Sequence, residues 1–378
     1  MIADSPLNKN EPQASEPPAQ AKPKGLPRVA GLDTIRFLLA LWVVFGHFGF
    51  FPIANALPGV PMIDKVWRTF GILFNGPGAV LVFFLISGFC IHIPYHRGKS
   101  LELRSYFVRR ETRIAIPVLA AFAIAFLVNN FHFAGVLWSL FCEEIYYTLY
   151  PFLLPLRRKY GWRPILTIAG TAAVATVIGY QILHPNNKEF LNFPGMGYGF
   201  TWILGYPMWL LGCLLAESCD VVKPWTKARA AIWIPRGGAW FLSIVFLLLR
   251  FHHLPLPGIG HLPYITYQYT LPIFGVVAFF WLKQEISYFS SYPPAKFAEA
   301  AGGASYTLYL THKLVIPILA TSEFATHHYV GDWLKTYAMV AIFTTIFYLL
   351  IEKPSHKLAR SLGDKFDAFG KRPVVTTA

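Results

Sequence analysis

The stretch that decides the fold is Gly31-Leu-Asp-Thr-Ile-Arg-Phe-Leu-Leu-Ala-Leu-Trp-Val-Val-Phe-Gly-His47, an apolar run that carries Asp33, Arg36 and His47. A charged group inside a membrane helix costs free energy and is functional by default. The eleven positions from Arg36 to His47 amount to three helical turns plus about 20°, so the two side chains share a stripe, separated by roughly 16 Å of rise. Asp33 falls one turn before Arg36. The stretch therefore predicts a membrane helix with a functional face.

Composition supports a membrane protein over the whole length. Of the 378 residues, 55% are hydrophobic and 14% are charged, whereas about a quarter of the residues in soluble domains are charged. Ten apolar stretches can each hold a span of about 17 to 25 residues. They lie near 29–50, 70–93, 114–132, 137–156, 164–183, 200–217, 238–252, 266–282, 305–322 and 335–352. We expect an all-α, polytopic membrane helix bundle with about ten transmembrane helices.

The distribution of basic residues predicts the orientation of this bundle. The net charge is +14, which could suggest a nucleic-acid partner. If the spans alternate from a cytoplasmic N-terminus, however, 26 of the 33 Lys and Arg residues fall on the cytoplasmic side. This is the positive-inside bias. The charge therefore orients the protein, with both termini cytoplasmic, and we expect no nucleic-acid partner.

The two ends of the chain differ from the apolar middle. Residues 1–28 contain six prolines and few large apolar groups, a composition that predicts a disordered cytoplasmic tail. A signal peptide ending near Ala54-Asn55-Ala56 is the competing interpretation, but charges interrupt its apolar core and the preceding tail is long. We expect a membrane domain over 29–356 and a cytoplasmic tail over 357–378. The four cysteines show no metal-binding spacing, so we expect no metal site.

Two adjacent carboxylates, Glu143 and Glu144, begin an otherwise apolar helix in Leu137-Trp-Ser-Leu-Phe-Cys-Glu-Glu-Ile-Tyr-Tyr-Thr-Leu-Tyr-Pro151. Neighbouring residues on a helix point about 100° apart, so one carboxylate can face the bundle while the other faces solvent or a second wall. The alternative is that both carboxylates are solvated at the outer membrane boundary, among ordinary interfacial aromatic residues.

Arginines mark the entrance of the third apolar stretch, in Arg109-Arg-Glu-Thr-Arg-Ile-Ala-Ile-Pro117. Arg110 and Arg113 lie one helical turn apart. Their guanidinium groups could clamp the phosphates of a nucleotide-bearing donor, because they offer paired donors and keep their charge. The alternative is that they only anchor a span on its cytoplasmic side.

A polar stripe crosses the ninth stretch, where Ser305, Tyr309 and His312 occupy positions i, i+4 and i+7. Such a stripe inside a span faces protein or water. A hydrogen-bonded packing role is the alternative to a direct role for His312.

In this order, these clusters resemble the acyltransferase 3 family of bacterial multi-pass membrane proteins. The resemblance runs from about residue 30 to 356. Its elements are Leu32-Asp33-x-x-Arg36 with His47, Ser87-Gly88-Phe89, the Arg109–Pro117 segment, Trp138-Ser139-Leu140-x-x-Glu143-Glu144, Ser305-Tyr306-Thr307-Leu308-Tyr309-Leu310-Thr311-His312 and Glu352-x-Pro354. Each motif alone is weak, but together and in this order they are specific.

The resemblance implies a function and a set of sites. Members of the family move acyl groups, commonly acetyl, from acyl-CoA onto hydroxyls of carbohydrates such as surface polysaccharides and oligosaccharides, in the bacterial cytoplasmic (inner) membrane. By position, His47 is the essential histidine, Arg36 belongs to the active-site region and Glu143 is the functional carboxylate. Arg110 and Arg113 serve the acyl-CoA site. The residues expected to contact substrate are Trp138, Ser139, Tyr309 and His312.

Histidine suits the chemistry, because imidazole titrates near the working pH and can take a proton from an acceptor hydroxyl. We expect His47 to be this base, with Glu143 or Asp33 orienting its ring and Arg36 or neighbouring donors stabilising the oxyanion. A two-step route through an acyl-enzyme is also open. The rival function is a secondary transporter or proton-coupled carrier, since intramembrane charges also line transport paths. We see no internal repeat that would support it.

Overall fold

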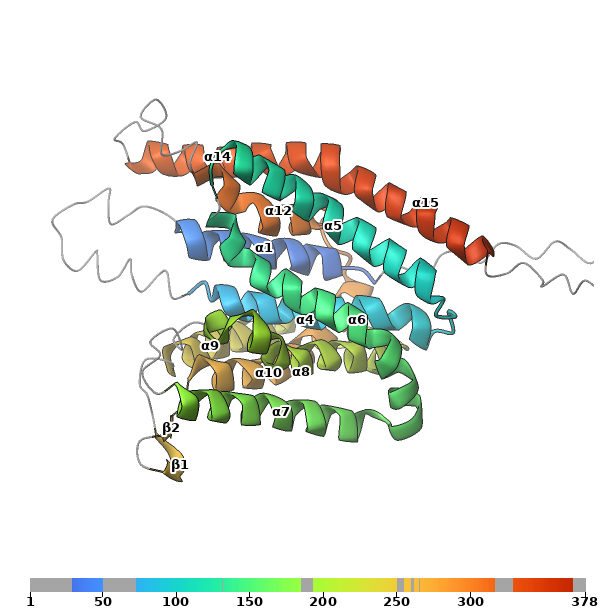
Figure 1. Ribbon diagram of the computed structural model, residues 1–378, viewed down its shortest axis with the longest axis vertical. Helices are drawn as coiled ribbons and strands as arrows, with labels where there is room; N and C mark the ends of the chain where they lie inside the picture. The colour runs from blue at the N-terminus through green and yellow to red at the C-terminus, as the bar shows by residue number, and fades with distance from the viewer. Residues whose placement is uncertain are drawn as a thin grey trace, which may run out of the picture.

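The computed structural model describes residues 29–49, 73–130, 132–184, 193–249, 255–259, 262–264, 266–316 and 329–369. Within these ranges the chain is a bundle of long, roughly parallel and antiparallel helices (Figure 1). The predicted tail over 1–28 and the candidate cleavage site near Ala54-Asn55-Ala56 lie outside the described residues, as do the end of the ninth predicted span and residues 370–378.

Helices account for nearly all of the regular structure. The first half contains α1 (Leu32–Phe48), α4 (Gly76–His96), α5 (Leu103–Leu127), η1 (His132–Val136), α6 (Leu137–Tyr160) and α7 (Trp162–Leu183). The second half contains η3 (Phe193–Met196), α8 (Gly197–Ser218), η4 (Arg229–Ile232), α9 (Trp233–Leu249), β1 (Pro255–Ile259), β2 (Leu262–Tyr264), α10 (Tyr267–Ser291), α11 (Lys296–Gly302), α12 (Ser305–Thr311), η5 (His312–Val315), α14 (Tyr329–Phe347), η6 (Tyr348–Glu352) and α15 (Lys353–Phe369).

Each of the ten predicted apolar stretches coincides wholly or partly with helix, and the helical class is confirmed. The described residues add one element that an all-α prediction omits, a short antiparallel hairpin of β1 and β2. Helix α5 begins eleven residues before its apolar stretch because Glu102 caps it, accepting a 2.6 Å hydrogen bond from the Ser105 N–H. The last predicted span continues through the π-turn η6 into α15, which packs along α5.

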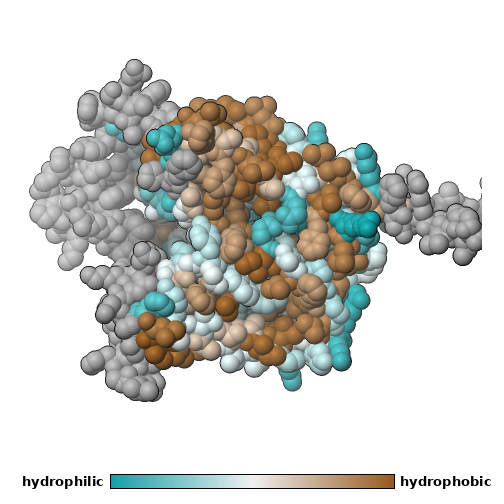
Figure 2. All heavy atoms as spheres, in the orientation of Figure 1, coloured by the Kyte–Doolittle hydropathy of each residue, from teal (hydrophilic) through white to brown (hydrophobic). Residues whose placement is uncertain are grey.

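Five helical segments of the described chain are long and apolar enough to cross a membrane. They are Gly76–His96, Trp162–Leu183, Phe193–Ser218, Arg229–Leu249 and Val330–Ala368. Large apolar side chains also point outward from the bundle, such as Phe126, Ile168 and Leu350, with about 70% or more of each side chain exposed. Apolar residues cover much of the face in Figure 2. These surfaces suit a hydrocarbon environment.

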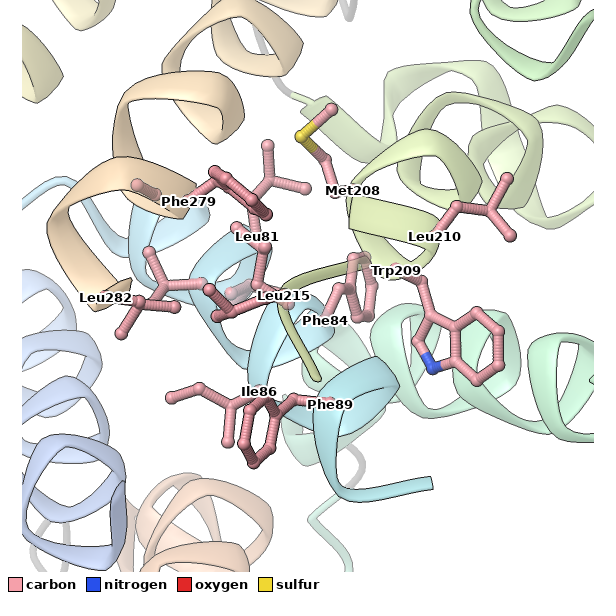
Figure 3. Close-up of a cluster of buried hydrophobic side chains, with 14 of the residues drawn as sticks. Leu81, Phe84, Ile86, Phe89, Met208, Trp209, Leu210, Leu215, Phe279 and Leu282 are labelled. Carbon is pink, nitrogen blue, oxygen red and sulfur yellow. The ribbon is translucent and has the colours of Figure 1, made fainter. Parts of the chain in front are cut away.

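The core lies between α4, α8 and α10. Figure 3 shows its buried side chains, including Leu81, Phe84, Trp209 and Leu282. Two glycines let α4 and α8 approach closely: a Cβ on Gly88 would lie 2.0 Å from the Trp209 carbonyl oxygen, and one on Gly212 would lie 2.0 Å from that of Leu85. Small residues at these positions therefore permit backbone contact between the two helices.

One end of the bundle gathers charged pairs. Near the end of α6, Arg157 donates to Glu217 at the end of α8. Near the start of α5, Arg109 donates to Asp364 of α15 at 3.0 Å. Figure 1 shows that α5 begins and α15 ends on this same side. His47, in the last turn of α1, lies toward the opposite end from Arg36.

Candidate active site

A carboxylate from a residue far along the sequence caps α1, the helix that carries Arg36 and His47. The N-cap of α1 is Gly31, which adopts φ 87° and offers no side chain to the open N–H groups. The carboxylate of Glu299 on α11 replaces it, accepting 3.1 Å hydrogen bonds from the backbone N–H groups of Gly31 and Thr34 and a 2.8 Å bond from the Thr34 hydroxyl. An anion at this position satisfies open N–H donors and complements the helix dipole.

At the other end of α1, His47 contacts His312. The Nδ1 of His47 lies 2.8 Å from the Nε2 of His312. The rings are nearly parallel, with an interplanar angle of 14° and centroids 4.9 Å apart. Because the centroid separation is close to the N–N distance plus the two ring radii, the rings lie end to end and nearly in one plane. His312 is fully buried, whereas His47 is exposed.

A cavity of about 110 Å³ lies among α1, α4, α5, α6 and α12. Three guanidinium groups line it, those of Arg36, Arg110 and Arg113. Arg36 lies 3.6 Å from Asp33. Within the described ranges, no carboxylate hydrogen-bonds to Arg110 or Arg113, and the Nε of Arg110 is buried without a partner. The cavity therefore offers charged donors to an anionic ligand.

The two adjacent carboxylates of α6 point in different directions, as predicted from the helical period. Glu143 lines the cavity, where Arg36, Arg113 and the hydroxyl of Ser87 interact with it electrostatically. Glu144 is absent from the cavity lining and interacts instead with Glu111 on α5. Glu143 is thus the carboxylate that can act on a ligand in the cavity.

The residues expected to contact substrate lie around the cavity and the His47–His312 pair. The hydroxyls of Ser139 and Tyr309 lie 2.7 Å apart on the cavity wall. Trp138 packs beside the cavity, against Phe84 and Phe193. Tyr309 also connects the cavity to the histidine pair, because its side chain lines the cavity and its carbonyl oxygen lies 2.8 Å from the Nδ1 of His312.

The structure therefore separates the predicted catalytic residues into two groups. Arg36 and Glu143 line the cavity, Asp33 pairs with Arg36, and His47 contacts His312. The roughly 16 Å of rise between Arg36 and His47 on one helix keeps their side chains apart. No carboxylate contacts His47 among the residues that the structure describes. The side chain that hydrogen-bonds to its ring is His312, where we expected Glu143 or Asp33.

One buried carboxylate near the cavity was not among the predicted site residues. Glu352, with no exposed surface, accepts hydrogen bonds from the backbone N–H and the hydroxyl of Thr307. Arg36 and Arg113 act on it electrostatically. The available signal was an acidic residue at the end of the last apolar stretch, in Ile351-Glu-Lys-Pro354, which sequence alone could not place beside the arginines.

Comparisons with known proteins identify the family of the chain. The Acyl_transf_3 family, described as an acyltransferase domain, matches residues 29–352. The chain is also 25% identical over 387 aligned residues to nodulation protein 10 of Rhizobium leguminosarum bv. viciae, covering 87% of this chain and 94% of that protein. No solved structure matches significantly. The protein belongs to the acyltransferase 3 family and is a membrane acyltransferase, of the kind that transfers groups other than aminoacyl groups.

Proposed function

We propose that the protein transfers an acyl group, acetyl in the first instance, from cytoplasmic acyl-CoA to a hydroxyl of an extracytoplasmic carbohydrate such as a surface polysaccharide or oligosaccharide. The observation that carries this proposal is the cavity with three guanidinium groups, joined through Tyr309 to the histidine pair. An anionic, nucleotide-bearing donor fits the first feature, and base-assisted attack by a hydroxyl fits the second.

Charge and geometry support the donor site. The phosphates of coenzyme A need charged donors that do not lose their protons, and guanidinium groups meet this need. Arg110 lacks a partner for its buried Nε, and its guanidinium lies 5.9 Å from the centre of the Tyr147 ring. A phosphate seated here would satisfy donors that the protein leaves open. We propose acyl-CoA as the donor co-substrate and no metal cofactor.

The positive-inside pattern supports the orientation. We place the protein in the bacterial cytoplasmic membrane with about ten spans and both termini in the cytoplasm. The end of the bundle that holds Arg109 and Arg157 then faces the cytoplasm, and His47 lies toward the outside. Since roughly 16 Å of helix separates Arg36 from His47, the acyl arm extends into the membrane from the cytoplasmic side, and the acceptor enters from the outer side.

The chemistry at His47 requires one proton to be transferred twice, first to the imidazole and then to the leaving group. The imidazole takes the proton from the acceptor hydroxyl as that oxygen attacks the thioester carbonyl, and the collapsing intermediate expels the coenzyme A thiolate, which receives the proton. The charge of the Lys313 ammonium acts on His47, and this supports Lys313 as the group that stabilises the oxyanion. Arg36 is too far along α1 for that task.

The test is acyl transfer by purified protein in detergent, with radiolabelled acetyl-CoA and an extract of envelope glycans. We expect label in the glycan with wild type and a loss of about 10²- to 10⁴-fold with His47→Ala, the range for a general base. His184→Ala, an exposed histidine at the end of α7, is the matched control and retains activity. Equal transfer by wild type and His47→Ala would remove His47 from the mechanism.

Detergent also separates the proposal from the rival function. A secondary transporter needs two compartments and would transfer no label in micelles, so transfer in detergent excludes transport as the whole activity. A burst of acetyl-CoA hydrolysis without acceptor would reveal an acyl-enzyme, whereas hydrolysis without a burst fits direct transfer.

A further inference from the structure

We propose that His312 is a positioning residue that sets the tautomer and the ring orientation of His47, so that the Nε2 of His47 is the nitrogen that takes the acceptor's proton. The inference deepens the proposed acyl transfer and rests on it for its catalytic meaning. It depends on a chain of hydrogen bonds that runs from the Tyr309 carbonyl through both imidazoles.

The first link fixes the proton on His312. Its Nδ1 lies 2.8 Å from the carbonyl oxygen of Tyr309 and 3.2 Å from that of Leu308. Carbonyl oxygens only accept hydrogen bonds, so the Nδ1 of His312 carries the hydrogen. A neutral imidazole has a single N–H, and the Nε2 of His312 therefore presents a lone pair.

The second link fixes the proton on His47. Its Nδ1 lies 2.8 Å from that lone pair on the Nε2 of His312. Two lone pairs would repel at this distance, so the Nδ1 of His47 donates. The end-to-end, nearly coplanar rings place this N–H in line with the acceptor. The Nε2 of His47 is then unprotonated, and within the described part of the chain it has no hydrogen-bond partner.

The difference in burial decides which of the two imidazoles can meet the acceptor. His312 has no exposed surface, so it offers no face to an acceptor and acts through His47. His47 is exposed at the end of α1. The ring of Phe48 stands edge-on to His312, with centroids 6.0 Å apart, and closes one side of the buried imidazole. The sequence predicted substrate contact for His312, whereas its burial favours a positioning role.

The pair also supports the reaction once the proton moves. When the Nε2 of His47 takes the hydroxyl proton, the ring becomes cationic and its Nδ1–H bond to His312 becomes charge-assisted. The proton then passes from the same Nε2 to the leaving thiolate. The Nδ1 hydrogen stays in place throughout. Second residues that hold a functional histidine by its other nitrogen play this part in known catalytic sites.

Two substitutions separate positioning from structure. His312→Gln keeps a carbonyl oxygen able to accept from the Nδ1 of His47, whereas His312→Leu removes the acceptor. We expect His312→Leu to lower kcat by about 10- to 100-fold, the range for one charge-assisted hydrogen bond, with KM for acceptor and acyl-CoA unchanged. His312→Gln recovers most of kcat. His92→Leu removes another buried histidine, on α4, and controls for loss of a packed imidazole.

A measurement without turnover covers the case in which the His312 variants do not fold. In wild-type protein labelled with ¹⁵N-histidine, nitrogen shifts distinguish protonated from unprotonated ring nitrogens, and His47→Gln assigns the His47 signals. We expect a protonated Nδ1 and an unprotonated Nε2 on His47, with scalar coupling to the Nε2 of His312 across the hydrogen bond. A protonated Nε2 on His47, or equal loss of kcat in His312→Gln and His312→Leu, overturns the proposal. If the wild-type protein shows the expected tautomer but transfers no acyl group, the proposed function is rejected. The assigned hydrogen bond between His47 and His312 then still stands.

Discussion

The carboxylate of Glu299 accepts hydrogen bonds from the backbone N–H and the hydroxyl of Thr34, 265 residues earlier in the chain. The contact joins α11 to the first turn of α1. Because Arg36 and His47 occupy the same helix, this single cap fixes the axial position of a cavity residue and of the catalytic candidate together. Gly302 at the end of α11 tightens the junction, since a Cβ there would lie 2.1 Å from the Asp33 carbonyl oxygen.

Glu299→Ala should therefore destabilise α1 and slow transfer. Loss of an N-cap acceptor costs about 0.5–2 kcal/mol, and we expect a lower midpoint of thermal unfolding in detergent together with a fall in kcat. Glu299→Gln keeps an acceptor and loses the charge, so its effect should be smaller. Lys296→Ala, an exposed change on the same short helix, is the control; an equal midpoint for Lys296→Ala and Glu299→Ala would contradict the capping role.

The close approach of α4 and α8 gives a second prediction. A second glycine on α8 provides the control. A Cβ on Gly212 would lie 2.0 Å from the Leu85 carbonyl oxygen, whereas one on Gly199 has nothing within 4 Å. Both changes to alanine favour helix by about 1 kcal/mol. We expect Gly212→Ala to be destabilising by about 1–3 kcal/mol through overpacking, and Gly199→Ala to be neutral or stabilising. Thermal unfolding of both variants checks this, and similar midpoints would show that the helices can separate without cost.

Much of the fold was predictable, because hydropathy and the helical period are local properties. The apolar stretches coincide with helices, and the 100° offset between Glu143 and Glu144 correctly assigned them to different faces. The charged start of α5 lay outside its predicted span because Glu102, a capping residue, starts the helix before the apolar run. The hairpin of β1 and β2 has no comparable alternating pattern in its Pro- and Gly-containing sequence.

The site was only partly predictable, because pairing between helices depends on packing. Arg36, Arg110 and Arg113 were each singled out from sequence, but only the structure places all three on one cavity. His47 and His312 are separated by 265 positions, and nothing local indicates that they share a hydrogen bond. A carboxylate partner for His47 was the simpler expectation, since a carboxylate orients the histidine of the Ser-His-Asp triad.

The arginines of α5 give a third prediction. Arg113 lines the cavity, whereas Arg109 donates to Asp364 and Asp367 of α15 and is absent from the cavity lining. Arg113→Ala should weaken coenzyme A binding by about 10- to 100-fold, the value of a charged hydrogen bond, measured by calorimetry in detergent. Arg109→Ala breaks a partly exposed ion pair and should leave affinity unchanged. Equal weakening by both would point to a general charge effect in place of a donor site.

Glu143 and Glu144 form a final matched pair, one residue apart on α6. Glu143 stands in the cavity with Arg36 and Arg113, and Glu144 stands beside Glu111. If Glu143 orders the guanidinium groups around the donor, Glu143→Gln should lower kcat/KM about tenfold or more, which corresponds to about 1.4 kcal/mol of transition-state stabilisation. Glu144→Gln should leave kcat/KM unchanged.

The affinity for coenzyme A distinguishes two roles of Glu143 in that experiment. Removing a negative charge from a cavity lined by guanidinium groups strengthens binding of an anion by simple electrostatics. If Glu143 only balances charge, Glu143→Gln binds coenzyme A more tightly and transfers acyl groups normally. If it orders the donor site, affinity does not rise in proportion and transfer falls, because the arginines lose the carboxylate that acts on them electrostatically. Calorimetry with coenzyme A and initial rates with acetyl-CoA, measured on the same preparations, decide between them.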